Sequence, residues 1–345
     1  MEQKQRLIGL DILRAIAIVS VVAGHFFSIN TPFNDTPVES ASMVFQGFLK
    51  ALFSNLGVPM FLILSGYLCS HKTLSKSYYI GLIRVLYSYV IISVITWTAL
   101  SDSHKISELF FGIINYRTIH YAWYIEMYIG LFLLIPFINI VLHNCFENKQ
   151  KSIALMATMI FLFSLPATFS RRQFHFLPSY WQICFPILCY SIGAYIKQFQ
   201  PVIHYKASAI VFALLLMFVS PTMELIYNNL TGGGNTFPGL FGPNYSIVGL
   251  FVNYVVFALL YKKEKFGKLS SIIITKLAIY SLNIYLFSYL FDQLIYPYFI
   301  SRFYTCQEQF ILFLIPIVVL VIVCSLFSSV IVDKTFDIFK KIVKI

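Results

Sequence analysis

The chain has 345 residues, of which 59% are hydrophobic and 11% charged, and its mean hydropathy is +0.78. This composition excludes an ordinary soluble globular domain and indicates a polytopic membrane protein. The net charge of +11 does not indicate nucleic-acid binding, because the basic residues follow the connections between apolar segments.

Ten apolar segments follow one another along the chain, and about twenty residues suffice to cross a bilayer. The predicted transmembrane helices are 8–28, 46–69, 79–100, 122–142, 152–170, 180–199, 205–225, 244–261, 272–298 and 309–332. The polar connections are short. The sequence therefore predicts an all-α membrane bundle in one domain, residues 1–345, without a soluble accessory domain.

Lysine and arginine divide unequally between the two sets of alternating connections. Sixteen lie on the termini and the connections of one set, whereas the other set holds Lys105, Arg117, Arg171, Arg172 and Arg302. Cytoplasmic loops carry the excess of basic residues. We therefore expect both termini in the cytoplasm and a multi-pass protein of the cell (plasma or inner) membrane.

The first predicted helix carries two ionisable residues, Arg14 and His25, inside its apolar run. Such residues cost roughly a few kcal/mol each in a bilayer, so they usually face the protein interior and mark a functional site. Eleven residues at about 100° each return to within about 20° of the starting direction and rise about 16 Å. Both side chains therefore share one helix face, with Arg14 nearer the cytoplasm. The alternatives are a structural arginine paired with Asp11 and a hydrogen-bonded core histidine.

The second predicted helix contains Gly57-Val58-Pro59 and, further on, Ser65-Gly66. Small residues allow close helix contact and proline bends a membrane helix, so this stretch alone predicts packing and a kink. Because this helix runs back towards the cytoplasm, Ser65 and Gly66 return to the depth of Arg14. Arg84, at the start of the third helix, lies at a similar depth and predicts an anion site with Arg14. Ordinary anchoring by basic residues explains Arg84 equally well.

Residues at the start of the fourth predicted helix are expected near the depth of His25. For Tyr121 and Tyr124 we expect the interfacial aromatic belt, and for Trp123 a role in lining the site. The ninth predicted helix carries a polar stripe of Asn283, Tyr285, Ser288 and Asp292, and such stripes usually face the bundle interior. No histidine or cysteine shows metal-ligand spacing, so no metal is predicted.

The motifs of this chain, taken together and in their order along the sequence, resemble those of the acyltransferase-3 family of integral membrane acyltransferases. The matching motifs are Arg14 with His25, Gly57 to Phe61 with Ser65-Gly66-Tyr67, Arg84, His120 to Tyr124 with Pro136, Gly193, and Ser281 to Ser288. The chain departs from the family at Ser288, where many members have histidine, and at Glu126, which is out of register with their glutamates.

The resemblance implies a bacterial O-acyltransferase. It would move an acyl group, expected to be acetyl, from cytoplasmic acyl-CoA to a hydroxyl of a cell-surface carbohydrate or glycolipid. Histidine is the side chain best suited to act as a base near neutral pH, and arginine suits phosphate. The predicted catalytic residues are His25, as base or acyl carrier, with Arg14 and Tyr285. The predicted donor-binding residues are Arg14, Arg84, Ser65 and Gly66. The predicted acceptor-binding residues are His120, Trp123, Glu126, Ser288 and Asp292.

Two other classes of protein fit part of the sequence. A polysaccharide or glycolipid transporter or flippase would also bury charges, although no internal repeat supports transport. A membrane sensor or inactive relative fits the serine at position 288. The partners expected are membrane lipid and the acceptor, without nucleic acid, and the oligomeric state is not predicted.

Overall fold

The computed structural model describes residues 7–102, 105–169, 178–237, 246–264 and 267–343. Every regular element in these ranges is a helix, as the sequence predicts. Arg171 and Arg172, which contribute to the predicted charge bias, lie outside the described residues, as do the end of predicted helix 152–170 and the start of 244–261.

The main helices are as follows, in chain order: α1 Ile8–Ser28, α2 Ala41–Leu56, α3 Val58–Cys69, α4 Lys76–Ile80, α5 Leu82–Leu100, α6 Ile106–Ile114, α7 Trp123–Phe146, α8 Lys149–Met159, α9 Leu165–Phe169, α10 Phe185–Phe199, α11 Lys206–Leu230, α12 Ile247–Leu260, α13 Lys268–Phe303, α14 Gln307–Phe310 and α15 Leu314–Val343. Short 3₁₀ turns precede α2, α7, α10 and α15, and a π-helical turn at Ile160–Ser164 joins α8 to α9.

Seven helical stretches in the described residues are long and apolar enough to cross a membrane. They coincide with seven of the ten predicted segments. The remaining three are shorter or interrupted, because segment 152–170 contains the π-helical turn, segment 180–199 begins with a 3₁₀ turn, and α12 has 14 residues. The count of ten spans and the cytoplasmic placement of the termini stay predictions.

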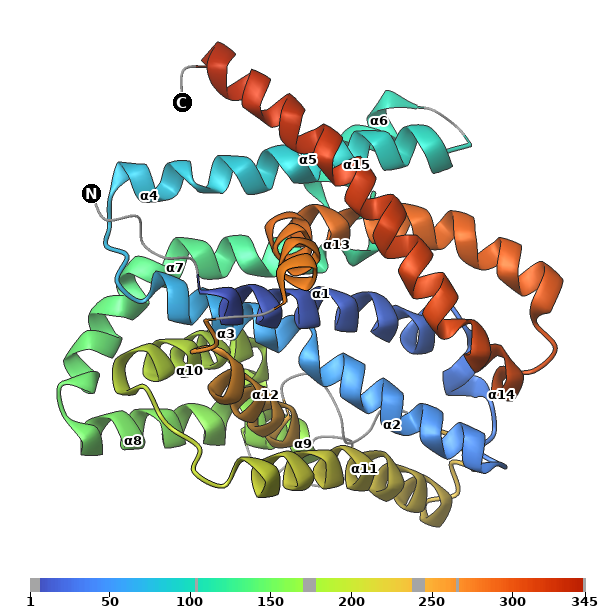
Figure 1. Cartoon of the computed structure of the whole chain (residues 1–345), viewed down its shortest axis with the longest axis horizontal. Helices are drawn as coiled ribbons and strands as arrows, with labels where there is room; N and C mark the ends of the chain where they lie inside the picture. Colours follow the sequence, from blue (N-terminus) through green and yellow to red (C-terminus); the bar gives the residue numbers. More distant parts are fainter. Residues whose placement is uncertain (1–6, 103–104, 170–177, 238–245, 265–266, 344–345) are drawn as a thin grey trace.

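Helix α1 forms the centre of the bundle (Figure 1). It is apolar nearly all round, which is typical of a helix buried on all sides, and it is the most buried of the seven candidate spans. It packs against α2, α3, α12, α13 and α15. Arg14 and His25 therefore lie on the helix that the other helices surround.

Glycines set the closest helix contacts. A Cβ atom added to Gly66 of α3 would lie 1.8 Å from the carbonyl oxygen of Tyr190 in α10, and one added to Gly193 of α10 would lie 1.9 Å from that of Ile63. A Cβ atom added to Gly9 of α1 would likewise lie 2.1 Å from the carbonyl oxygen of Leu260. Small residues let membrane helices approach this closely, so α3 and α10 form a tightly packed pair beside α1.

The predicted kink of the second apolar segment is a complete break. Helix α2 ends at Leu56, Gly57 has φ −76° and ψ −100°, and α3 restarts with Pro59 in its first turn. Proline is tolerated at this position because the N–H groups of the first helical turn have no acceptor within the helix, so no hydrogen bond is lost. Broken helices occur inside membranes where they line a cavity. The break lies opposite Val21 of α1, because a Cβ atom added to Gly57 would lie 2.8 Å from Cγ2 of Val21.

Candidate functional site

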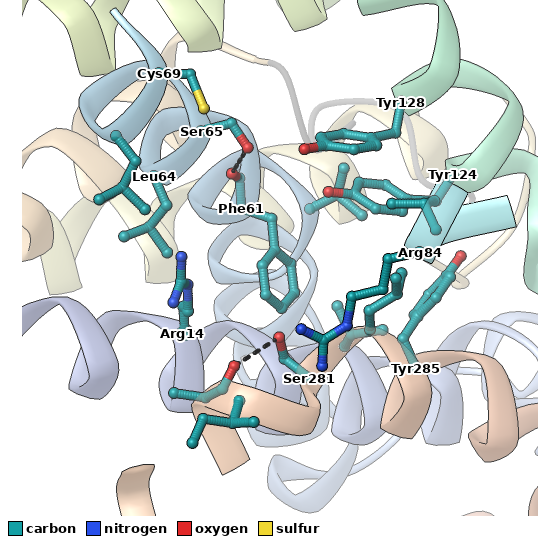
Figure 2. Close-up of a pocket in the computed structure, with 17 residues that line it drawn as sticks. Arg14, Phe61, Leu64, Ser65, Cys69, Arg84, Tyr124, Tyr128, Ser281 and Tyr285 are labelled. Atoms are coloured by element: carbon teal, nitrogen blue, oxygen red, sulfur yellow. Dashed lines mark hydrogen bonds between the residues drawn. The ribbon is translucent and has the colours of Figure 1, made fainter. Parts of the chain in front are cut away.

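A cavity of about 490 Å³ is lined by both predicted arginines. We call it the arginine cavity. Arg14 comes from α1 and Arg84 from α5, while Phe61 and Ser65 belong to α3 and Tyr285 to α13. Figure 2 shows Arg14 and Arg84 on two sides of Phe61. Two guanidinium groups in one pocket can bind a polyanion such as phosphate.

Arg84 is already paired with a carboxylate. Its Nη2 lies 2.5 Å from Oδ1 of Asp333 on α15, and the two side chains are 53% and 25% exposed. The Arg84 guanidinium also lies 5.9 Å from the centre of the Phe336 ring. An anion that binds Arg84 must therefore share this arginine with Asp333 or displace it.

The residues predicted beside Arg14 on the second apolar segment have different surroundings. Ser65 lines the arginine cavity, and its hydroxyl donates to the carbonyl oxygen of Phe61 at 2.9 Å. Gly66 does not line this cavity but packs against the backbone of Tyr190. Asp11, the proposed partner of Arg14, is buried and accepts a hydrogen bond from Thr275 of α13 at 3.4 Å.

A second cavity, of about 190 Å³, is lined by His25, and we call it the histidine cavity. Ser20, Ser28 and Trp123 also line it, together with the helix break at Gly57. Trp123 is therefore placed as predicted, beside the histidine.

The arginine cavity and the histidine cavity meet at three side chains. Val21, Val58 and Tyr285 line both of them. These residues come from α1, from the helix that restarts after the break, and from α13. These three side chains form a common wall between the arginine cavity and the histidine cavity.

The Nδ1 side of His25 faces a buried carboxylate and a tyrosine ring. Its Nδ1 lies 3.6 Å from Oδ2 of Asp292 on α13, and the Asp292 side chain is fully buried. The same oxygen accepts hydrogen bonds from the Tyr121 hydroxyl at 2.7 Å and from Nδ2 of Asn30 at 3.0 Å. The Tyr121 ring also packs on the His25 ring, with centroids 3.8 Å apart. Because Nδ1 faces this buried carboxylate, Nε2 is the nitrogen available for chemistry.

This arrangement has the geometry of a general base with its orienting carboxylate. A carboxylate that accepts a hydrogen bond from Nδ1 fixes the tautomer and stabilises the imidazolium that forms when Nε2 takes a proton. At 3.6 Å the His25 Nδ1 does not yet make this hydrogen bond. Separations in an unliganded site are often longer than a hydrogen bond and shorten when substrate binds. The sequence predicted Asp292 as an acceptor-binding residue, whereas the structure places it against the histidine.

Tyr285 lies at the site, but its hydroxyl already donates a hydrogen bond within the protein. It donates to the carbonyl oxygen of Tyr121, and its ring packs edge-on against that of Tyr124. Tyr285 therefore forms a wall of both cavities, and it must release the Tyr121 carbonyl before it can donate to a reacting oxygen.

The other predicted acceptor residues lie apart from the two cavities. Ser288 is buried and donates to the carbonyl oxygen of Tyr285 at 2.7 Å. His120 and Glu126 are exposed and line neither cavity, although the His120 ring contacts that of Tyr121 edge-on. Their roles stay predictions.

Sequence reasoning missed three residues of this site. Tyr121 and Tyr124 were predicted for the interfacial belt, but their exposed fractions are 1% and 8%, because their rings pack inside the bundle against His25 and Tyr285. Asn30 lies just beyond the end of α1, where a polar residue ordinarily signals only a turn. No local pattern marks Asn30 as a partner of Asp292. Among the described residues no group of histidine, cysteine and acidic side chains could hold a metal ion.

Comparison with known proteins gives one match. Residues 7–331 match the family model Acyl_transf_3, described as an acyltransferase domain. The matched range contains every residue of both cavities. No curated protein and no solved structure matches the chain.

Proposed function

Because the chain belongs to the Acyl_transf_3 family of acyltransferases, we propose that it is a membrane O-acyltransferase that moves an acetyl group from acyl-CoA to a hydroxyl of a cell-surface carbohydrate or glycolipid. Its apolar helices and its family indicate a multi-pass membrane protein, and we propose the plasma membrane as its location. The observation that carries the proposal is the position of His25, which lies against a buried carboxylate in a cavity that joins the arginine cavity.

The donor would enter by the arginine cavity. Arg14 and Arg84 would bind its phosphates, since planar guanidinium groups match phosphate oxygens. The slender thioester arm would then pass between Val21, Val58 and Tyr285 and bring its carbonyl carbon to the histidine cavity. This route separates the charged part of the donor from the reacting carbonyl.

The acceptor hydroxyl would be activated at His25. Nε2 takes its proton while the hydroxyl oxygen attacks the thioester carbonyl carbon; the carbon–sulfur bond then breaks, and the imidazolium returns the proton to the thiolate. Asp292 stabilises the imidazolium from the Nδ1 side. In a second route Nε2 attacks the thioester carbonyl carbon and expels the thiolate; the acceptor hydroxyl then attacks the acyl-imidazolium, Nε2 is released, and the hydroxyl proton passes to the thiolate. Both routes use the same nitrogen and the same carboxylate.

Arg14→Ala is expected to weaken use of the donor. Loss of a charged hydrogen bond costs about 1.5–3 kcal/mol, so the KM for acetyl-CoA should rise by roughly 10- to 100-fold. The measurement compares acetyl-CoA with S-acetyl-pantetheine, which lacks the nucleotide phosphates. The variant should lose the preference for acetyl-CoA while its turnover of S-acetyl-pantetheine stays as in the wild type.

Arg302→Ala is the matched control for this prediction. Arg302 packs on the Tyr298 ring near the end of α13 and lines neither cavity, so its removal should leave both donors unaffected. An unchanged preference for acetyl-CoA in Arg14→Ala would exclude Arg14 from phosphate binding.

Asp292→Asn is expected to lower kcat by about a hundredfold, because an orienting group contributes part of the roughly 10²–10⁴-fold effect of a general base. The side chain keeps its size and its contacts with Tyr121 and Asn30, so thermal stability and the KM for acetyl-CoA should change little. Steady-state kinetics separate the two parameters. A variant with normal kcat would show that Asp292 has only a structural role.

The proposed function itself is tested by mass analysis of surface glycans from cells with and without this protein. A glycan fraction heavier by one acetyl group per acceptor unit supports it. Purified protein in detergent should also transfer label from radioactive acetyl-CoA to that glycan. Identical glycan masses together with no consumption of acetyl-CoA would refute the proposal.

A further inference from the structure

A third cavity, of about 470 Å³, lies between α5, α6 and Tyr289 of α13, and we call it the threonine cavity. Thr96 and Trp97 of α5 line it, together with Phe111 of α6 and Thr118 of the connection that leads to α7. Arg117, Asn115 and Glu108 add a charged and polar border. Neither the arginine cavity nor the histidine cavity includes any of these residues.

Two hydroxyl groups at this cavity lack a partner. Thr96 is 1% exposed, and neither its Oγ1 nor that of Thr118 makes a hydrogen bond with any residue that the structure describes. A buried hydroxyl without a partner costs about 1–3 kcal/mol. Both oxygens are buried, and rotation about χ1 to another staggered position is what would bring either hydroxyl to the cavity that its residue lines. Both groups are therefore suited to a ligand that offers several hydrogen-bonding groups.

The threonine cavity is connected to His25 by packed rings. Tyr289, which lines the cavity, packs edge-on against Tyr121 with centroids 5.2 Å apart, and Tyr121 packs on His25. Thr118 also precedes Tyr121 by only three residues. Two tyrosine rings, those of Tyr289 and Tyr121, would thus separate a molecule in the threonine cavity from His25.

Helix α6 forms one wall of this cavity and is apolar except at Ser107 and Glu108. Ile106, Phe110 and Ile114 are 77%, 59% and 55% exposed, whereas Gly112 faces the cavity. A short apolar helix with exposed side chains beside a membrane bundle is suited to contact with lipid. The cavity would therefore be open to a polar group held at the membrane surface.

We propose that the threonine cavity binds a sugar ring of the acceptor, next to the sugar whose hydroxyl reaches His25. A sugar ring supplies hydroxyls for Thr96, Thr118 and the polar border, and its C–H faces pack against aromatic rings such as Trp97 and Phe111. Sites of this kind combine a largely apolar wall with a few polar groups that fix orientation. This inference rests on the proposed function, and it adds the position of the acceptor and the residues that recognise it.

Photo-crosslinking identifies the occupant directly. Benzoylphenylalanine placed at Asn115 should give an adduct in cells, and mass analysis should show sugar units in it. The control position is Phe110, which is on α6 but does not line the cavity. A lipid tail on the adduct indicates a lipid-linked glycan, and its absence indicates a free polysaccharide. No adduct, or one without sugar, overturns the inference.

Thr96→Val and Thr118→Val test the recognition. Valine keeps the shape of threonine and removes a buried hydroxyl, so both variants should fold at least as well as the wild type. The KM for the surface glycan purified from the same cells should rise about tenfold in each, while the KM for acetyl-CoA stays constant. Thr98→Val is the control, because Thr98 is exposed on α5 and bonds to the carbonyl oxygen of Val94.

The two failures can be distinguished. An unchanged KM for the glycan in both threonine variants overturns the inference while acetyl transfer by the wild type leaves the proposed function intact. If the wild type transfers no acetyl group, the proposed function fails, and the crosslinked adduct still reports whether the cavity holds a sugar.

Discussion

Replacing His25 by alanine is expected to lower acetyl transfer by about a thousandfold or more, because general-base catalysis contributes roughly 10²–10⁴-fold and both routes through the site require this nitrogen. His25→Gln should be equally inactive, since its amide can still donate to Asp292 but cannot take a proton from a hydroxyl. The measurement is transfer of labelled acetyl from acetyl-CoA to glycan by purified protein.

The control for this prediction is His204→Ala. His204 is exposed in the connection before α11 and lines none of the cavities described. Its loss should leave transfer unchanged, and all three variants should elute as the wild type does in size-exclusion chromatography. Undiminished transfer by folded His25→Gln would remove the histidine from the mechanism.

Gly66→Ala is expected to lower the stability and the membrane yield of the folded protein. The new methyl group would lie 1.8 Å from the carbonyl oxygen of Tyr190, and a backbone atom cannot rotate away as a side chain can. Helices α3 and α10 must separate, at a cost typical of overpacking, about 1–3 kcal/mol or more. Yield from membranes and the thermal melting temperature measure the loss, and Gly193→Ala should behave in the same way.

Gly130→Ala is the matched control, because no atom lies within 4 Å of a Cβ added to Gly130 in α7. It should fold normally, since alanine favours a helix by about 1 kcal/mol over glycine. The comparison also decides between two roles of Gly66. If Gly66→Ala folds normally and only its KM for acetyl-CoA rises, Gly66 belongs to the donor site, as the resemblance implies, and its packing role is secondary.

Local sequence patterns are sufficient to predict some of the residues that line the two cavities. Arg14 and His25 occur on one helix, so helical periodicity alone predicts that they share a face. The structure places them on two adjoining cavities. Trp123 was predicted to line the site because the start of the fourth apolar segment was expected near the depth of His25, and in the structure it lines the histidine cavity.

Contacts between distant helices could not be predicted in the same way. Asp292 meets His25 because α13 packs along α1, and no spacing in the sequence records which residue of one helix faces which residue of the other. Asp333 meets Arg84 for a similar reason, through the packing of α15 on α5. Tyr121 was assigned to the interface because tyrosine is common there, and only the tertiary structure shows that it is buried.

The apolar junction of Val21, Val58 and Tyr285 also bears on the permeability of the membrane. Under the proposed function, the arginine cavity receives the donor from the cytoplasm and the histidine cavity receives the acceptor from outside, so an open passage between them would conduct protons and ions. Narrow hydrophobic constrictions expel water and block ion flow, so these three side chains would insulate the two compartments whenever no donor is bound. When the thioester arm occupies the constriction, the substrate itself closes the passage, and acyl groups can cross without a leak.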